Sequence, residues 1–148
     1  MTKKFKMEKV LELREKALEK EKIKLSELIT IEEEIRAERQ VIADDINQKS
    51  AELEEDRQNN RFDFIDMYNK YIKLRQKDLI ECETRRKQAE QNIINQKEVL
   101  RKALNDVKVM EKLKEKDMDN YINNMKHLEQ KELDEIAVLK YAQLNGFQ

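Results

Sequence analysis

The 148-residue sequence contains no proline, no tryptophan, one glycine and one cysteine. Tight turns between β-strands depend on Gly, Pro and Asn-Gly pairs, and the one Asn-Gly pair stands close to the end of the chain. Aromatic residues make up 5% of the sequence and hydrophobic residues 39%. These shortages exclude most β-rich folds and a thick globular core.

Charged residues, by contrast, make up 43% of the sequence, and 31 basic residues nearly balance 32 acidic ones. Binding to nucleic acid needs clustered, unneutralised Lys and Arg, so we expect no nucleic-acid partner. No apolar stretch approaches the length of a membrane-spanning helix or of the apolar part of an export signal. We therefore expect no direct membrane insertion and a cytoplasmic location.

The side chains that usually carry catalysis are scarce. His127 is the only histidine and Cys82 the only cysteine, so metal clusters and Cys/His or Ser/His/Asp arrangements fail on counting. A glycine-rich phosphate loop is also missing. We expect no enzyme activity, no catalytic residues, no cofactor and no metal. Cys82 is interpreted as a small buried hydrophobic residue and His127 as a surface residue.

Two long periodic segments, typical of helices, meet near residues 58–63. Asn is the residue after Gly that best tolerates the left-handed backbone ending a helix, and Asn59 and Asn60 lie at this break. The pattern predicts a helix over residues 6–59, a turn over 59–63 and a helix over 64–144. We expect the whole chain, 1–148, to form one domain.

Apolar residues recur every seven residues along two rows in each segment, a pattern typical of coiled coils. The rows of the first segment are Met7, Arg14, Glu21, Leu28, Ile35, Ile42 and Lys49, and Leu11, Leu18, Leu25, Glu32, Arg39, Ile46 and Leu53. The rows of the second are Ile65, Ile72, Leu79, Arg86, Ile93, Leu100 and Val107, and Tyr68, Arg75, Cys82, Ala89, Gln96, Ala103 and Met110. Val10, Ala17 and Ile31 are expected to widen the first stripe. The fold predicted is all-α, an antiparallel coiled-coil hairpin whose C-terminal helix is longer.

A fold between Asn60 and Arg61 would pair residues whose numbers sum to 121, although a shift by one heptad would match the apolar phase equally well. In this register the chain after about Lys116 has no partner helix. An extra four-residue step in the repeat, known as a stutter, and several poor helix formers predict a joint or kink near residues 114–124. The unpartnered stripe must bind something, fold back or self-associate; it comprises Met118, Tyr121, Ile122, Met125, Leu128, Leu133, Ile136, Leu139 and Tyr141.

Three segments of the chain resemble the flagellar export protein FliJ family. The opening Phe5-Lys6-Met7-Glu8-Lys9-Val10-Leu11-Glu12-Leu13-Arg14-Glu15-Lys16 is similar to the start of that family. The stretches Met110-Glu111-Lys112-Leu113-Lys114-Glu115-Lys116 and Lys131-Glu132-Leu133-Asp134-Glu135-Ile136-Ala137 are similar to its closing pattern. The resemblance covers nearly the whole chain.

This resemblance implies a stalk-like coiled coil of the flagellar type III export apparatus, cytoplasmic and peripherally associated with the inner membrane at the flagellar base. The implied partners are the flagellar export ATPase, whose ring the family binds and helps to assemble, the membrane protein of the export gate, and export chaperones. The residues expected to contact the ATPase, here called the ATPase group, are Phe5, Val10, Leu13, Met118, Tyr121, Leu133, Asp134, Glu135, Ile136 and Leu139. The residues expected to contact the gate, here called the gate group, are Phe64, Tyr68, Tyr71 and Ile72.

Two other interpretations stay open at this point. The equivalent stalk of a virulence-type secretion system would obey the same physics. A structural coiled-coil scaffold or tether could instead form a parallel dimer through one continuous helix. A basic leucine-zipper DNA binder is excluded because no basic region precedes the heptads. The aromatic residues near the turn either pack the end of the coiled coil or anchor a partner.

Overall fold

The computed structural model describes residues 4–145, which form two α-helices. Helix α1 spans Glu8–Gln58 and helix α2 spans Ile65–Asn145, and the described residues contain no strand. The predicted all-α hairpin with a longer second helix is confirmed, and each helix end lies within two residues of its predicted position. Packing divides the chain into two units: residues 19–101, and residues up to 18 together with those from 102 onward. The expected organisation as one domain stays a prediction.

The turn in the unit of residues 19–101 is closed by a left-handed asparagine. Asn60 has a φ of 57°. The amide of Arg61 donates to the carbonyl of Asp56 at 2.7 Å, and that of Asn60 donates to the carbonyl of Arg57 at 3.2 Å. These two bonds are those of the Schellman motif, which satisfies the last carbonyls of a helix. Asn therefore ends α1 where Gly would otherwise be expected.

Every buried residue among residues 4–145 lies on a predicted heptad row. In the unit of residues 19–101 these residues are Glu32, Ile42, Leu53, Cys82, Ala89 and Gln96. In the other unit they are Leu11, Leu18, Val107 and Met110. The predicted widening of the stripe by Ala17 and Ile31 is wrong, because both side chains are exposed. A seam only two residues wide is what two helices can bury between them.

Cross-helix polar contacts establish the register. They join residues whose numbers sum to between 116, for Tyr71 with Asp45, and 123, for Arg85 with Glu38. The predicted sum of 121 falls inside this range, and the sums of 114 and 128 that a one-heptad shift would give fall outside it. The structure therefore resolves the ambiguity that the apolar pattern alone left open.

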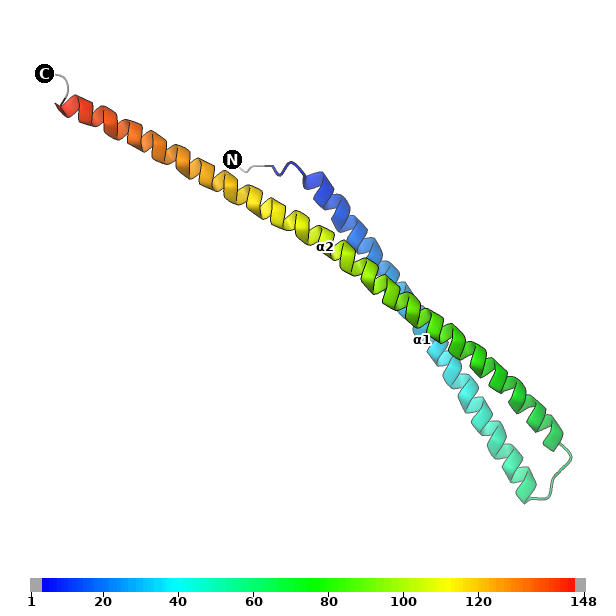
Figure 1. The fold of residues 1–148 in the computed structure, drawn as a ribbon. Coiled ribbons are helices and arrows are strands. Elements are labelled where there is room, and N and C mark those ends of the chain that lie inside the picture. Colours follow the sequence, from blue (N-terminus) through cyan, green and yellow to red (C-terminus); the bar gives the residue numbers. More distant parts are fainter. Residues whose placement is uncertain (1–3, 146–148) are drawn as a thin grey trace. The chain divides into compact units, whose positions relative to one another are not determined.

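The second half of α2 continues beyond the start of α1 in the same unit (Figure 1). Helix α2 runs through residues 114–124 without interruption, and the expected joint there stays a prediction. From Ile122 to Tyr141 every residue is exposed. We call residues 117–145 the tail.

Candidate docking surfaces

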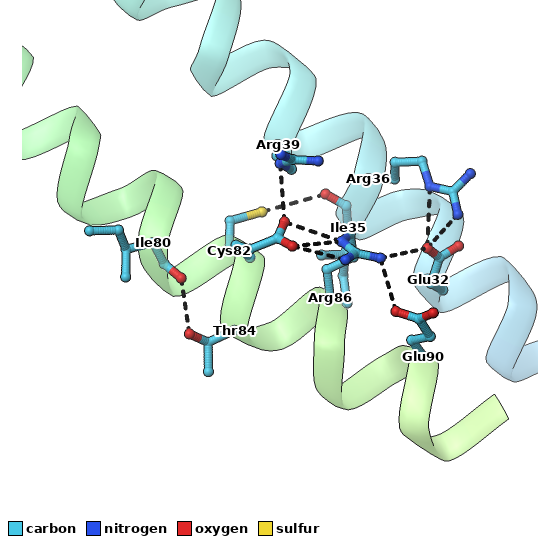
Figure 2. A network of polar contacts seen from close by, with 10 residues as sticks. Glu32, Ile35, Arg36, Arg39, Ile80, Cys82, Thr84, Arg86 and Glu90 are labelled. Atoms are coloured by element: carbon cyan, nitrogen blue, oxygen red, sulfur yellow. Dashed lines mark hydrogen bonds and ion pairs between the residues drawn. The ribbon is translucent and has the colours of Figure 1, made fainter. Parts of the chain in front are cut away.

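A polar network crosses the seam in the middle of the unit of residues 19–101 (Figure 2). The carboxylate of Glu32, 5% exposed as a residue, accepts hydrogen bonds from Arg36 at 2.6 and 3.2 Å and lies 3.9 Å from Arg86 of the facing helix. Arg86 also pairs with Glu83 and with Glu90. Burial of Glu32 is tolerable because its charge is paired and hydrogen-bonded.

The network extends from Arg86 toward the turn through Glu83 and Arg39. Arg39 pairs with Glu83 at 3.1 Å, and the pKa of Glu83 is lowered, first by the hydrogen bonds from Arg86 and then by the charge of Arg39. The fully buried thiol of Cys82 donates to the carbonyl of Ile35 at 3.4 Å. The described part of the chain has no buried side-chain polar atom without a partner, so this network is structural and internally satisfied.

A second cluster lies near the turn and contains part of the gate group. The hydroxyl of Tyr71 donates to Asp45 at 2.5 Å, and Arg75 pairs with the same carboxylate at 3.0 Å. The hydrogen bond from Tyr71, followed by those from Arg75, lowers the pKa of Asp45, and the same bond raises the pKa of Tyr71. Burial raises the pKa of Tyr68. A shallow pocket beside the cluster is lined by Lys49, Glu52, Met67, Tyr68 and Tyr71.

The gate group does not form one surface. Tyr68 and Ile72 are half-buried on the seam, whereas Phe64 is 57% exposed and Tyr71 37% exposed. Two exposed neighbours of Tyr71 were missed, Met67 and Leu74, which share its helix face at four- and three-residue spacing. Once the helix is predicted, their spacing from Tyr71 places them on that face, so the sequence could have identified both residues.

The start of α1 and the segment of α2 beside it hold three members of the ATPase group. Phe5 and Val10 are half-buried and Leu13 is 66% exposed. Glu8 pairs with Lys114 of α2 at 3.0 Å, and a shallow pocket there is lined by Lys4, Phe5, Lys6, Glu8, Lys9, Glu12 and Lys114. Lysine side chains dominate this pocket, so its surface is basic.

The tail of α2 presents an apolar face, which we call the tail face. Its members fall within an arc of about 140° at roughly 100° per residue; they are Met118, Tyr121, Ile122, Met125, Leu128, Leu133, Ile136 and Leu139. The arc continues the direction of Val107 and Met110, which are buried against α1. Beyond the start of α1 the same face is uncovered: Ile122 is 43%, Ile136 49% and Leu139 63% exposed.

The tail face separates the ATPase group into two sets. Met118, Tyr121, Leu133, Ile136 and Leu139 lie within the arc. Asp134 lies nearly opposite and accepts a hydrogen bond from Gln130 at 3.0 Å, and Glu135 lies just outside the arc. Both carboxylates line a second shallow groove, with Lys131, Val138 and Leu139. Four polar residues of the tail also stand inside the arc, Glu129, Glu132, Lys140 and Gln143, and a search for apolar spacing alone does not find them.

The described residues contain no group of three or more His, Cys, Asp or Glu side chains placed to hold a metal ion. Within residues 4–145 neither helix has a stretch that is long and apolar enough to cross a membrane. The surfaces available for function in this part of the chain are therefore docking surfaces on helices, of which the tail face has the most uncovered apolar side chains.

Comparison with known proteins gives one result. A search of curated proteins and a search of solved structures each found no match. The model of the family described as "Flagellar FliJ protein" matches residues 3–146, nearly the whole chain. The resemblance seen in the opening and closing segments is thereby confirmed. A match of this extent, together with two helices of unequal length in a hairpin, shows that the chain belongs to the flagellar FliJ protein family.

Proposed function

We propose that this protein binds the ring of the flagellar export ATPase through the tail face and the start of α1, and that it promotes assembly of that ring. Family membership supports a coiled-coil component of the flagellar export apparatus. The observation that carries the finer proposal is the uncovered tail face. Seven exposed large apolar side chains continue a seam that is buried elsewhere, and contiguous exposed apolar surface of this kind marks interaction sites.

The proposed contact uses the apolar members of the ATPase group first. Leu133, Ile136 and Leu139 are exposed by 49% to 63%, and burying such side chains favours association by roughly 25 cal/mol for each Å² removed from water. Phe5, Val10 and Leu13 at the start of α1 extend the contact. Asp134 and Glu135, on the second groove, stay predicted contacts.

The remaining partners belong to the same proposal. The gate group, with Phe64 and Tyr71 as its exposed members, would contact the membrane protein of the export gate, and export chaperones would bind the protein as clients are delivered. The protein would act without catalysis, in the cytoplasm and peripherally at the inner membrane. The family match favours the flagellar apparatus over a virulence-type system.

The test is the ATP turnover of the organism's flagellar export ATPase, measured with substoichiometric amounts of this protein while light scattering follows ring formation. We expect stimulation and ring assembly together. Deleting residues after Asp117 should abolish both while a helical hairpin remains. Full activity of the truncated protein would contradict the assignment of the tail.

A matched pair of point variants separates the tail from the rest of the surface. Ile136→Ser changes an exposed isoleucine of the tail face, and Ile80→Ser changes one that is 67% exposed in the other unit. Both lie in α2, so their intrinsic effects on the helix are the same. We expect loss of ATPase stimulation only for Ile136→Ser. Equal loss from both variants would show that the tail face has no special role.

A further inference from the structure

Several carboxylates beside the chain's own seam pair with a basic side chain of the opposite helix. Glu21 differs, because it accepts a hydrogen bond from the neutral Gln96. In the unit of residues 19–101, Asp45 pairs with Arg75 at 3.0 Å and Glu38 with Arg85 at 2.8 Å. In the other unit, Glu8 pairs with Lys114 at 3.0 Å. Flanking charges that pair across the interface are how coiled coils select their partners.

Glu129 and Glu132 occupy the tail face, which continues the seam, but lack such partners. Both side chains are exposed and make no hydrogen bond or ion pair within the described residues. Lys126 stands three residues before Glu129, whereas the helix cannot supply a base to Glu132: acidic Glu129 and Glu135 stand three residues away, and apolar Leu128 and Ile136 stand four away. Neighbours at these spacings are the ones a helical side chain can reach.

The net charge of the tail points the same way. Residues 117–145 carry six acidic and three basic residues, a net charge of −3. The two segments that pair in the same unit, residues 4–18 and 102–116, each carry five basic and three acidic residues, a net charge of +2. An anionic lipid surface would repel the tail. A parallel pair of tails would place Glu129 against Glu129 and Glu132 against Glu132, which is unfavourable.

We propose that the surface receiving the tail face is an apolar groove rimmed by lysine and arginine side chains, and that Glu129 and Glu132 pair with that rim. The inference rests on the proposed function, in which the export ATPase supplies the groove. Apolar side chains of the tail face fill the groove. The two carboxylates, which would be costly to cover without a base, orient the helix and select the partner.

The experiment measures binding of full-length protein to the flagellar export ATPase by titration calorimetry at low and high salt. The variants are Glu129→Lys and Glu132→Lys, alone and combined, and the matched control is Asp119→Lys, an equal charge change outside the arc. We expect the double variant to bind about tenfold or more weakly at 0.05 M salt. The loss should shrink at 0.5 M salt, where charges are screened within a few Å, and Asp119→Lys should bind like the wild type.

The outcomes separate the two proposals. Tight wild-type binding with no effect of either Glu→Lys change and no salt dependence would overturn the basic rim and leave the ATPase contact standing. No binding of the wild type would overturn both. An equal loss from Asp119→Lys would show a general charge effect and overturn the assignment to Glu129 and Glu132. Self-association of the wild type through the tail, without ATPase binding, would identify a second copy as the occupant and overturn the proposal.

Discussion

Two methionines of α2 should respond in opposite ways to the same substitution. Met110 is 2% exposed, packed against the start of α1, whereas Met125 is 44% exposed on the tail face. They are separated by about four helical turns and lie on the same stripe. Met→Ala changes helix propensity little at either position. The difference between the two variants therefore reports whether the stripe is covered by α1 at each place.

Met110→Ala should destabilise the chain by about 2–3 kcal/mol. Truncating a buried Met costs roughly 2–5 kcal/mol, and the lower part of this range applies because a two-helix seam can close around the gap. The folding equilibrium should fall about 30- to 150-fold, and the melting temperature by roughly 4–12 °C for a chain of this size. Met125→Ala should change the free energy of unfolding by less than about 0.5 kcal/mol.

Binding to the ATPase should show the reverse order. Met125→Ala removes apolar surface from the proposed contact and should weaken binding by about fivefold or more, while Met110→Ala at a temperature where it is folded should bind normally. Urea unfolding followed by circular dichroism measures the first property and calorimetric titration the second. Equal destabilisation by both variants would show that the tail is covered within the chain, by folding back or otherwise, and would refute the reasoning.

Four further outcomes follow from single residues. Asn60→Ala should cost about 1 kcal/mol in urea unfolding because alanine disfavours the left-handed backbone, whereas Asn60→Gly should not destabilise. Tyr71 and Arg75 lower the pKa of Asp45, so the ionised Asp45 carboxylate stabilises the folded chain above about pH 4. The difference in unfolding free energy between wild type and Asp45→Asn should therefore close as the pH falls through the folded pKa. A difference that stays constant from pH 7 to 2 would contradict this. The pKa of Tyr71 is raised by the same bond, so the difference between wild type and Tyr71→Phe is present below about pH 10 and should close as the pH rises through the folded pKa. Cys82, fully buried, should react with a thiol reagent about a hundredfold or more slowly in native buffer than in denaturant; equal rates would show that the seam is open there.

The helices and the heptad phase of their pairing could be predicted because they depend on local signals. Heptad spacing placed Leu11, Cys82 and Met110 on the seam, and all three are buried. The turn could be predicted from Asn59 and Asn60 since few other residues tolerate its backbone. Ala17 and Ile31 were misplaced because a seam between only two helices is narrower than the apolar stripe of a helix on a globular core.

The polar contacts could be predicted only in part. Rows that mix Glu32, Arg86 and Gln96 with apolar residues indicated charges near the seam, but which base meets which acid depends on rotamers and on the offset between helices. The predicted sum of 121 places each such charge opposite an apolar residue, for example Glu32 opposite Ala89. Instead Glu32 meets Arg36 and Arg86, because a buried charge is stable only when paired.

The docking surfaces, like the polar contacts, could be predicted from the sequence only in part. The uncovered stripe of the tail follows from the unequal helix lengths, which the turn position determines. The separation of Asp134 from Leu133 and Ile136 follows from helix geometry but not from their nearness in the sequence. The place of Glu129 and Glu132 on the same surface as the apolar residues also follows from helix geometry and not from apolar spacing.

Hydrogen exchange of the full-length protein, alone and bound to the assembled ATPase ring, tests the central proposal most directly. Amides of the tail belong to a stretch of α2 that extends beyond α1 in the same unit, so we expect them to exchange quickly in the free protein. Binding should slow exchange across residues 118–144 and at the start of α1, and leave residues 62–80 unchanged. Slowed exchange confined to residues 62–80, with an unaltered tail, would contradict the proposal that the tail face binds the ATPase.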